Sequence, residues 1–134
     1  MESEVRTALD RFRSGDEEDA FFELLDIPGD LLPVLIDVFR TEPNVAIRAL
    51  LVRVAWERRD HLALAFLGEA LNDLQEEIWQ QALDGLVAFA LPESLEILQR
   101  ARTREGEDDT AARLFQLWLE EAIGQVEFEL RRQL

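Results

Sequence analysis

Apolar residues recur at three- and four-residue spacing along almost the whole chain, and this periodicity restricts the possible fold most strongly. Such spacing places apolar side chains on one face of an α-helix, whereas a half-buried strand needs strict alternation. Alternating runs rich in β-branched residues are not sustained anywhere, so we expect an all-α protein. Proline, glycine or aspartate interrupts the stripe. These interruptions predict eight helices, over residues 2–13, 16–26, 30–40, 43–59, 61–71, 74–90, 92–104 and 109–131.

Aspartate and proline mark several of the predicted helix starts. A carboxylate placed before a first turn can accept hydrogen bonds from its free backbone N–H groups. The aspartates in this position are Asp16, Asp30, Asp60 and Asp73. Pro33 and Pro92 fall in first turns, where the missing N–H is not needed.

The predicted helix over residues 43–59 is apolar almost all round. A helix of this kind must be covered on more than one side, so we place it in the middle of a stack of helices. The predicted last helix carries a broad apolar stripe from Leu114 to Val126 and is long enough to close one end of the stack.

The charge of the chain limits its possible partners. It has 29 acidic residues, 14 arginines and no lysine, which gives a net charge of −15 over 134 residues. A charge of this sign repels phosphates, so the composition argues against nucleic acid as a partner and favours basic proteins. Residues 1–30 carry a net −7 and residues 31–72 are neutral, while residues 73–106 and 107–134 carry −4 each.

Length and composition also indicate the class of protein. A chain of this length, 48% apolar, fits one globular domain with a sizeable core. No stretch free of charged residues exceeds eight residues, which is too short to span a membrane. The first residues, Met1 to Glu4, lack the features of a signal peptide, so we expect a cytoplasmic location.

A repeat of 33 residues joins two parts of the chain. Shifted by that length, Val45–Leu50 aligns with Ile78–Leu83, and Val54–Trp56 aligns with Val87–Phe89. Each copy has the length of one helical hairpin, which cannot bury its apolar face alone, so copies stack and share a core. Small residues such as Ala49, Ala82 and Gly85 allow neighbouring helices to approach closely.

These residues resemble the HEAT-repeat family, particularly its short bacterial units. The matching positions are Leu67, Ala70, Leu71, Asp73, Ile78, Ala82, Gly85 and Leu86, preceded by Leu35, Phe39, Pro43, Val45 and Ala49. The resemblance implies an α-solenoid of stacked hairpins as a single domain over residues 1–134. Its recognisable repeats span residues 30–104, with capping helices over residues 1–29 and a capping helix over residues 105–134.

The sequence departs from the family pattern at two places. The arginine that follows the valine of the motif is Ala46 in one unit and Trp79 in the other, and the earlier unit lacks the aspartate before its second helix. The sequence therefore does not decide whether this chain has the Asp–Arg ladder that links successive repeats in the family.

The sequence offers little catalytic chemistry. It has no cysteine, its single histidine is His61, and its six glycines form no phosphate-binding loop. A lone histidine needs an orienting carboxylate for acid–base work, so we interpret His61 as a surface or capping residue. We expect a protein that is not an enzyme and that needs no cofactor and no metal.

Acidic clusters are the only concentrated chemistry, and three interpretations apply to them. Carboxylates in a first turn stabilise the helix dipole, a cluster can bind a hard cation, and several clusters together can form a docking face. In stacked hairpins alternate helix starts share one edge, which favours the docking face when the clusters are taken together. The candidate partner-binding acids are Asp16, Glu17, Glu18, Asp19, Glu76, Glu77, Asp108 and Asp109.

Trp79 completes the predicted partner-binding set, because it stands at the arginine position of the family motif, at the edge of the buried face. An exposed tryptophan there is a common hot spot of interfaces. The alternative is that Trp79 packs sideways onto the next hairpin.

Three functions follow as hypotheses. The first is a protein-binding module. The resemblance implies a sharper form of it, because small acidic bacterial HEAT-like proteins look like immunity proteins, and the partner would then be a basic toxin that this protein neutralises. The second is a structural adaptor or oligomeric scaffold subunit. The third is a nucleic-acid-processing enzyme similar to the HEAT-like DNA glycosylases, which the acidic charge disfavours because those enzymes need a basic cleft.

Overall fold

The computed structural model describes residues 1–104 and 109–134, and these residues form eight α-helices, one short 3-10 turn and no strand. The all-α prediction and the eight predicted helices are thereby confirmed, with ends that differ by a few residues. The elements are α1 (Glu2–Arg13), α2 (Glu17–Asp26), α3 (Leu32–Thr41), α4 (Val45–Glu57), α5 (Ala63–Leu71), α6 (Glu76–Phe89), α7 (Pro92–Arg100), η1 (Ala101–Thr103) and α8 (Thr110–Arg132).

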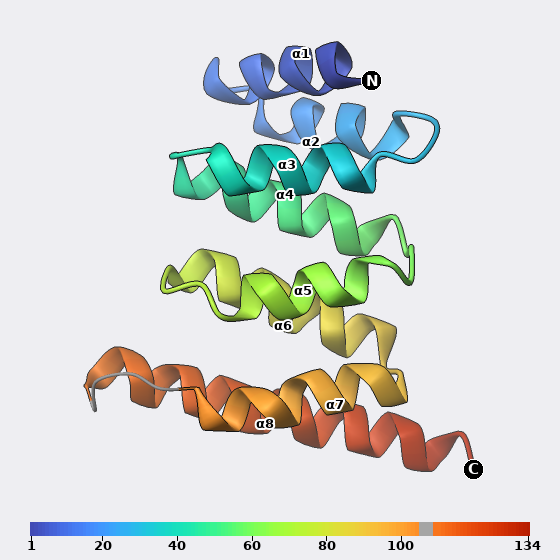
Figure 1. Cartoon of the computed structure of the whole chain (residues 1–134), viewed down its shortest axis with the longest axis vertical. Coiled ribbons are helices and arrows are strands. Elements are labelled where there is room, and N and C mark those ends of the chain that lie inside the picture. Colours follow the sequence, from blue (N-terminus) through green and yellow to red (C-terminus); the bar gives the residue numbers. More distant parts are fainter. Residues whose placement is uncertain (105–108) are drawn as a thin grey trace.

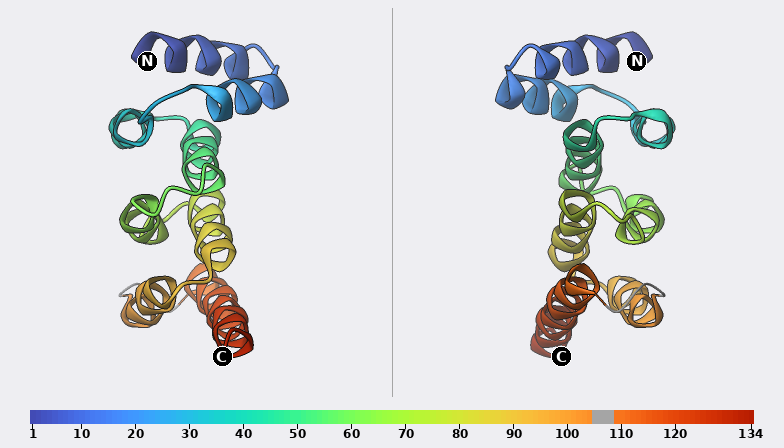
Figure 2. Two further views of the ribbon diagram at one scale, coloured as in Figure 1. Left: turned by 90° about the vertical axis from the view of Figure 1, so that its right-hand side faces the viewer. Right: turned by 90° about the vertical axis from the view of Figure 1, so that its left-hand side faces the viewer.

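The helices form stacked hairpins in two layers (Figures 1 and 2). The first helices of three hairpins, α3, α5 and α7, lie in one layer, and their second helices, α4, α6 and α8, lie in the other. The hairpin of α1 and α2 lies across the N-terminal end of this stack (Figure 2). The second helices all begin at the same edge of the stack, the left edge in Figure 1. None of the helices in the described residues is long and apolar enough to cross a membrane.

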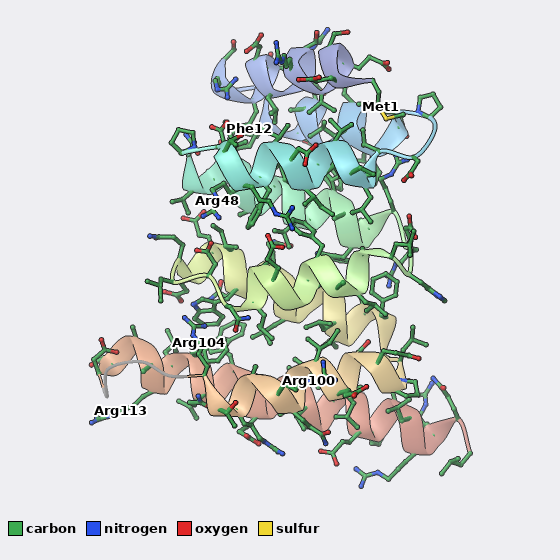
Figure 3. All side chains as sticks on the ribbon, viewed as in Figure 1. Met1, Phe12, Arg48, Arg100, Arg104 and Arg113 are labelled. Carbon is green, nitrogen blue, oxygen red and sulfur yellow. The ribbon has the colours of Figure 1, made fainter. Side chains whose placement is uncertain are left out.

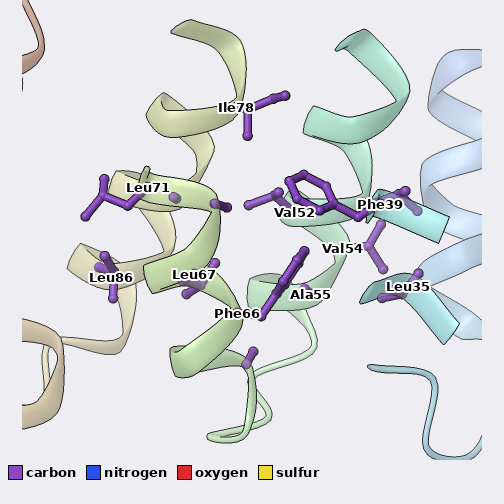
Figure 4. Close-up of a cluster of buried hydrophobic side chains, with 14 of the residues drawn as sticks. Leu35, Phe39, Val52, Val54, Ala55, Phe66, Leu67, Leu71, Ile78 and Leu86 are labelled. Carbon is purple, nitrogen blue, oxygen red and sulfur yellow. The ribbon is translucent and has the colours of Figure 1, made fainter. Parts of the chain in front are cut away.

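Helix α4 occupies the middle of the stack, as its sequence predicts. It contacts α2, α3, α5 and α6, and its closest packing is against α6. Its buried side chains are Ile47, Leu50, Leu51, Val52, Val54 and Ala55. Figure 4 shows the core next to it, where the rings of Phe39 and Phe66 meet edge to face at 5.0 Å. The buried side chains form one continuous core from Val5 on α1 to Val126 on α8.

The close contact between α4 and α6 depends on Gly85. A Cβ atom at this position would lie 2.7 Å from Cβ and Cγ of Trp56 and 2.9 Å from Cδ1 of Leu67. Both distances are shorter than real carbon contacts, so only glycine fits without a shift of α4. Beside this contact, the indole Nε1 of Trp56 donates a hydrogen bond of 3.1 Å to Oε1 of Gln81, which links the two helices again.

Two arginines hold the ends of helices in neighbouring hairpins. Arg58, at the end of α4, donates to the carbonyl oxygens of Leu25, Ile27 and Gly29 at 2.8–2.9 Å. Arg104 donates in the same way to the carbonyl oxygen of Leu71, at the end of α5, at 3.1 Å. The last carbonyl groups of a helix lack intrahelical hydrogen-bond donors and carry partial negative charge. A guanidinium group supplies both the donors and a compensating positive charge.

A further arginine provides an Asp–Arg link between hairpins, two residues after the position that the family motif suggests. Nη2 of Arg48 on α4 pairs with the carboxylate of Asp73 at 2.8 Å, and both side chains are largely buried. Nε of Arg48 also donates to the carbonyl oxygen of Phe39, at 3.2 Å. The motif position is Ala46, which is why the alignment leaves this link open.

The predicted aspartate caps are correct in part. Asp16 occupies the N-cap of α2, but its side chain accepts no hydrogen bond from the first turn. Asp30, Asp60 and Asp73 precede the actual N-caps, which are Leu31, Leu62 and Gln75. Asp60 and Asp73 instead accept from the backbone N–H two residues later, at 2.9 Å, as short polar side chains do in turns. Pro33 and Pro92 lie in first turns, as predicted.

Substitution of Gly85 tests the contact between α4 and α6. Gly85→Ala should lower the free energy of unfolding by about 1–3 kcal/mol, because the added methyl group overpacks the contact with Trp56. Gly124→Ala is the matched control, since a Cβ there meets no atom within 4 Å. The control should raise stability by about 0.5–1 kcal/mol through helix propensity. Urea unfolding measures both, and a stabilised Gly85→Ala protein would contradict the close approach.

Substitution of Arg58 tests its role at the helix ends. Arg58→Met should lower the free energy of unfolding by about 2–3 kcal/mol, because three carbonyl oxygens lose a charged donor. Arg6→Met removes the same charge from an exposed pair with Glu2 and should change stability by no more than about 0.5 kcal/mol. Equal losses in the two variants would show that charge alone, and not the carbonyl contacts, is responsible.

Candidate protein-binding surface

The predicted acidic clusters lie along the edge where the second helices begin (Figure 1). Asp16 to Asp19 stand at the start of α2, and Glu76 and Glu77 stand in the first turn of α6. Asp109 is the N-cap of α8, and its carboxylate accepts from the N–H of Ala112 at 2.8 Å. Asp108 lies outside the described residues. Asp109 therefore caps the start of α8, as the helix-start interpretation of the acidic clusters predicts.

The clusters at α2 and α6 do not form one site. The start of α4 lies between them along this edge, so one helix separates the two clusters (Figure 1). Arg48 stands on α4 at this edge (Figure 3) and is already paired with Asp73. The edge therefore presents two separate patches of negative charge.

The carboxylates of these two patches have no cationic partner in the described part of the chain. The arginines pair instead with other acids, such as Glu42, Glu69 and Glu120. Asp16 to Asp19, Glu76 and Glu77 thus keep their charge available to a partner. Within residues 1–104 and 109–134, no group of three or more acidic or histidine side chains is arranged to hold a metal ion.

Trp79 is not available to a partner, so its place in the predicted binding set is wrong. Its side chain is 3% exposed and packs edge-on against Phe115 of α8, with ring centroids 5.2 Å apart. The alternative interpretation, in which Trp79 packs onto the next hairpin, is confirmed. Trp118 of α8 is the tryptophan that reaches the surface, with 41% of its side chain exposed.

A groove between α6 and α8 brings Trp118 together with acidic side chains. It has a volume of about 290 Å³ and lies between two helices of the second layer. Its lining residues are Leu83, Asp84, Val87, Ala88, Trp118, Glu121, Ala122 and Gln125. Asp84 belongs to α6 and Glu121 to α8, and neither forms an ion pair in the described residues. The groove therefore combines two unpaired carboxylates, an exposed indole and an apolar floor.

The electrostatics of Asp84 differ from those of the paired acids. A hydrogen bond from Arg40 holds the pKa of Glu69 below its usual range, and Arg102 does the same for Glu120. Burial against the groove wall instead raises the pKa of Asp84, with no compensating cation. A carboxylate kept in a partly desolvated position without a partner costs stability, which is typical of functional sites.

The arrangement suits a guanidinium or ammonium group from another molecule. A cation in the groove would meet the carboxylates of Asp84 and Glu121 and the face or edge of the Trp118 ring. Cation–π contacts contribute about 0.5–2 kcal/mol, and the alkyl stem of lysine or arginine packs well on apolar surface. His61 lies exposed between α4 and α5 with its ring against Phe89, 6.0 Å between centroids, and takes no part in this groove.

Sequence reasoning missed this groove for an identifiable reason. Trp118 and Asp84 each fit a helical periodicity, so Trp118 counts as part of the apolar stripe of the last helix. Only the register between α6 and α8 decides that the two side chains share one hollow. The usable signal was the pair Trp118 and Glu121, which stand one helical turn apart at the edge of that stripe.

Replacement of Asp84 should reveal the cost of its burial. Because the pKa is raised in the folded state from the ordinary 3.8, ionisation of Asp84 opposes folding, and this penalty appears as pH rises through the folded-state value. Asp84→Asn should therefore raise the midpoint of thermal unfolding by about 2 °C at pH 7 and by nothing at pH 3. Glu93→Gln, which removes an exposed charge at the start of α7, should show no such gain. A gain for Asp84→Asn that persists at pH 3 would contradict burial as its cause.

Comparison of the chain with protein-family models, with curated proteins and with solved structures found no match.

Proposed function

We propose that this protein is a non-catalytic binding module whose partner is a basic protein, with the groove between α6 and α8 as the central contact. The observation that carries the proposal is the pairing of unneutralised carboxylates, Asp84 and Glu121, with the exposed indole of Trp118. Tryptophan and charged groups of this kind are the usual energetic centres of protein interfaces. A lysine or arginine of the partner enters the groove and forms the central contact.

The acidic patches at the helix starts support the same proposal in a different way. Asp16 to Asp19, Glu76 and Glu77 lie at the edge where the second helices begin, and no arginine of the described residues pairs with them. Exposed charges of this kind contribute little affinity at long range, but they steer a basic protein towards the surface. We assign them to the rate of association, and we assign the groove to the lifetime of the complex.

The sharper form of the proposal is that the basic partner is a bacterial toxin, which this protein neutralises as an immunity-type inhibitor. That form rests on the HEAT-like residues of the sequence and on the acidic charge of −15. Binding of a toxin through its basic surface would block access of the toxin to its own target without any catalysis by this chain.

The product of the adjacent open reading frame is the natural ligand for a first test. Calorimetric titration should give a complex whose affinity falls about tenfold between 50 and 300 mM salt, because screening weakens the attraction of opposite charges. Asp84→Asn and Trp118→Ala should each weaken binding by about tenfold or more. Glu93→Gln, an equal loss of charge on α7, should weaken it by less than about twofold.

Each outcome bears on a separate part of the proposal. Equal effects of Asp84→Asn and Glu93→Gln would contradict the groove as the central contact, although binding by net charge would survive. An affinity that does not change with salt would contradict the electrostatic part. A bound protein whose toxicity continues in the complex would contradict the immunity-type role.

A further inference from the structure

The two ends of the helical stack present different surfaces. The outer face of α1 is polar, with Ser3, Arg6, Thr7 and Asp10 exposed, as expected for a helix that caps a stack. The outer face of α8 is not. Leu117 and Phe128 are 69% and 56% exposed there, so the C-terminal end of the stack leaves large apolar side chains in water.

These exposed side chains form one stripe along α8. Leu117, Glu121, Gly124, Phe128 and Arg131 follow one another at four- and three-residue spacing, which places them on one face of a helix. The opposite face of α8 carries the buried side chains Phe115, Leu119, Ala122, Ile123 and Val126, which pack against the rest of the stack. The stripe therefore faces away from the core, with Glu121 at its edge next to the groove between α6 and α8.

The charges and the shapes along the stripe are arranged symmetrically. Glu121 and Arg131 stand five residues to either side of position 126, and Gly124 and Phe128 stand two residues to either side. Neither Glu121 nor Arg131 forms an ion pair in the described part of the chain. A Cβ atom at Gly124 would meet nothing within 4 Å, so the space above this glycine is open.

We propose that α8 binds α8 of a second copy of this chain, antiparallel, about a two-fold axis near position 126. In a two-fold interface, a residue i of one copy contacts a residue j of the other copy, and residue j of the first copy contacts residue i of the second. In this register Glu121 of each copy lies opposite Arg131 of the other, and Phe128 of each copy lies over Gly124 of the other. An apolar ring then fills the hollow that the glycine leaves, and both unpaired charges gain a partner.

Net charge sets the conditions under which the pair forms. Two copies of charge −15 repel each other at long range, while the Glu121–Arg131 contacts attract at short range. At 0.15 M salt the screening length is about 8 Å, which suppresses the distant repulsion more than the direct contacts. Self-association should therefore strengthen as salt rises from 10 to 150 mM, opposite to the behaviour expected for a basic partner.

Sedimentation equilibrium in 150 mM salt tests the proposal. The native protein should show a mass that rises with concentration from 15.5 kDa towards twice that value. Gly124→Gln should raise the dissociation constant at least tenfold, because its side chain enters the space that Phe128 of the other copy occupies. The same change should leave the monomer folded, since glutamine favours a helix more than glycine does. A native protein that stays monomeric up to 0.5 mM would overturn the proposal.

Charge reversal tests the antiparallel register. Glu121→Arg and Arg131→Glu should each weaken self-association about tenfold, whereas the protein that carries both changes should regain it. A mixture of the two single variants should form a mixed pair more readily than either forms with itself. Failure of the double variant to recover would overturn the register.

Glu121 belongs to both proposed surfaces, because it also lines the groove between α6 and α8, so residues that belong to one surface alone distinguish them. Gly124 and Phe128 do not line the groove, so at protein concentrations where the native chain is monomeric Gly124→Gln should leave the affinity for the basic partner unchanged. Asp84→Asn should weaken binding of the basic partner and leave self-association normal. Gly124→Gln should weaken self-association and leave binding of the basic partner normal, and these opposite results would separate the two surfaces.

Discussion

The need to cover α4 on several sides determines the architecture of this protein. Its buried residues point towards α2, α3, α5 and α6, and water on any of these sides would expose a large part of the core. Burial of a leucine, isoleucine or valine side chain stabilises a fold by about 1.5–3 kcal/mol, so α4 alone requires a stack of hairpins around it. Gly85 then sets how close the next hairpin lies.

Arginine usage explains why so much negative charge remains on the surface. Arg58 and Arg104 are engaged by backbone carbonyl oxygens, and Arg48 pairs with the largely buried Asp73. Other arginines join successive hairpins, as Arg40 does with Glu69 at 2.6 Å. Within the described residues, no arginine pairs with the acids of the α2 and α6 starts or with Asp84 and Glu121 of the α6–α8 groove. Much of the excess acid therefore lies where the described arginines do not neutralise it.

The fold could be predicted from the sequence to a large extent, because periodicity and helix breakers are local signals. The apolar character of residues 43–59 indicated the central helix, and the 33-residue repeat indicated hairpins that pack in the same way. The importance of Gly85 as a small residue was predictable from the repeat, but its contact with Trp56 was not. The link between Arg48 and Asp73 was also missed, because the arginine stands two residues after the position in the family pattern.

The candidate site was much less predictable, because it depends on the register between helices. Trp79 and Trp118 both lie at the edge of apolar stripes, and only the packing of α6 on α8 decides that the first is buried and the second exposed. The acids at helix starts were found from sequence because they are clustered. Asp84 was overlooked because it is a single acid within an amphipathic helix, and its lack of a cation appears only in three dimensions.

The indole N–H signals of the three tryptophans provide the most direct measurement of the proposed binding surface. Trp56 donates its indole N–H to Gln81, Trp79 is buried, and Trp118 lines the open groove. In a titration of the labelled protein with its basic partner, followed by nuclear magnetic resonance, the signal of Trp118 should shift strongly and that of Trp56 should stay in place. A complex that forms while the Trp118 signal remains unchanged would contradict the assignment of the groove.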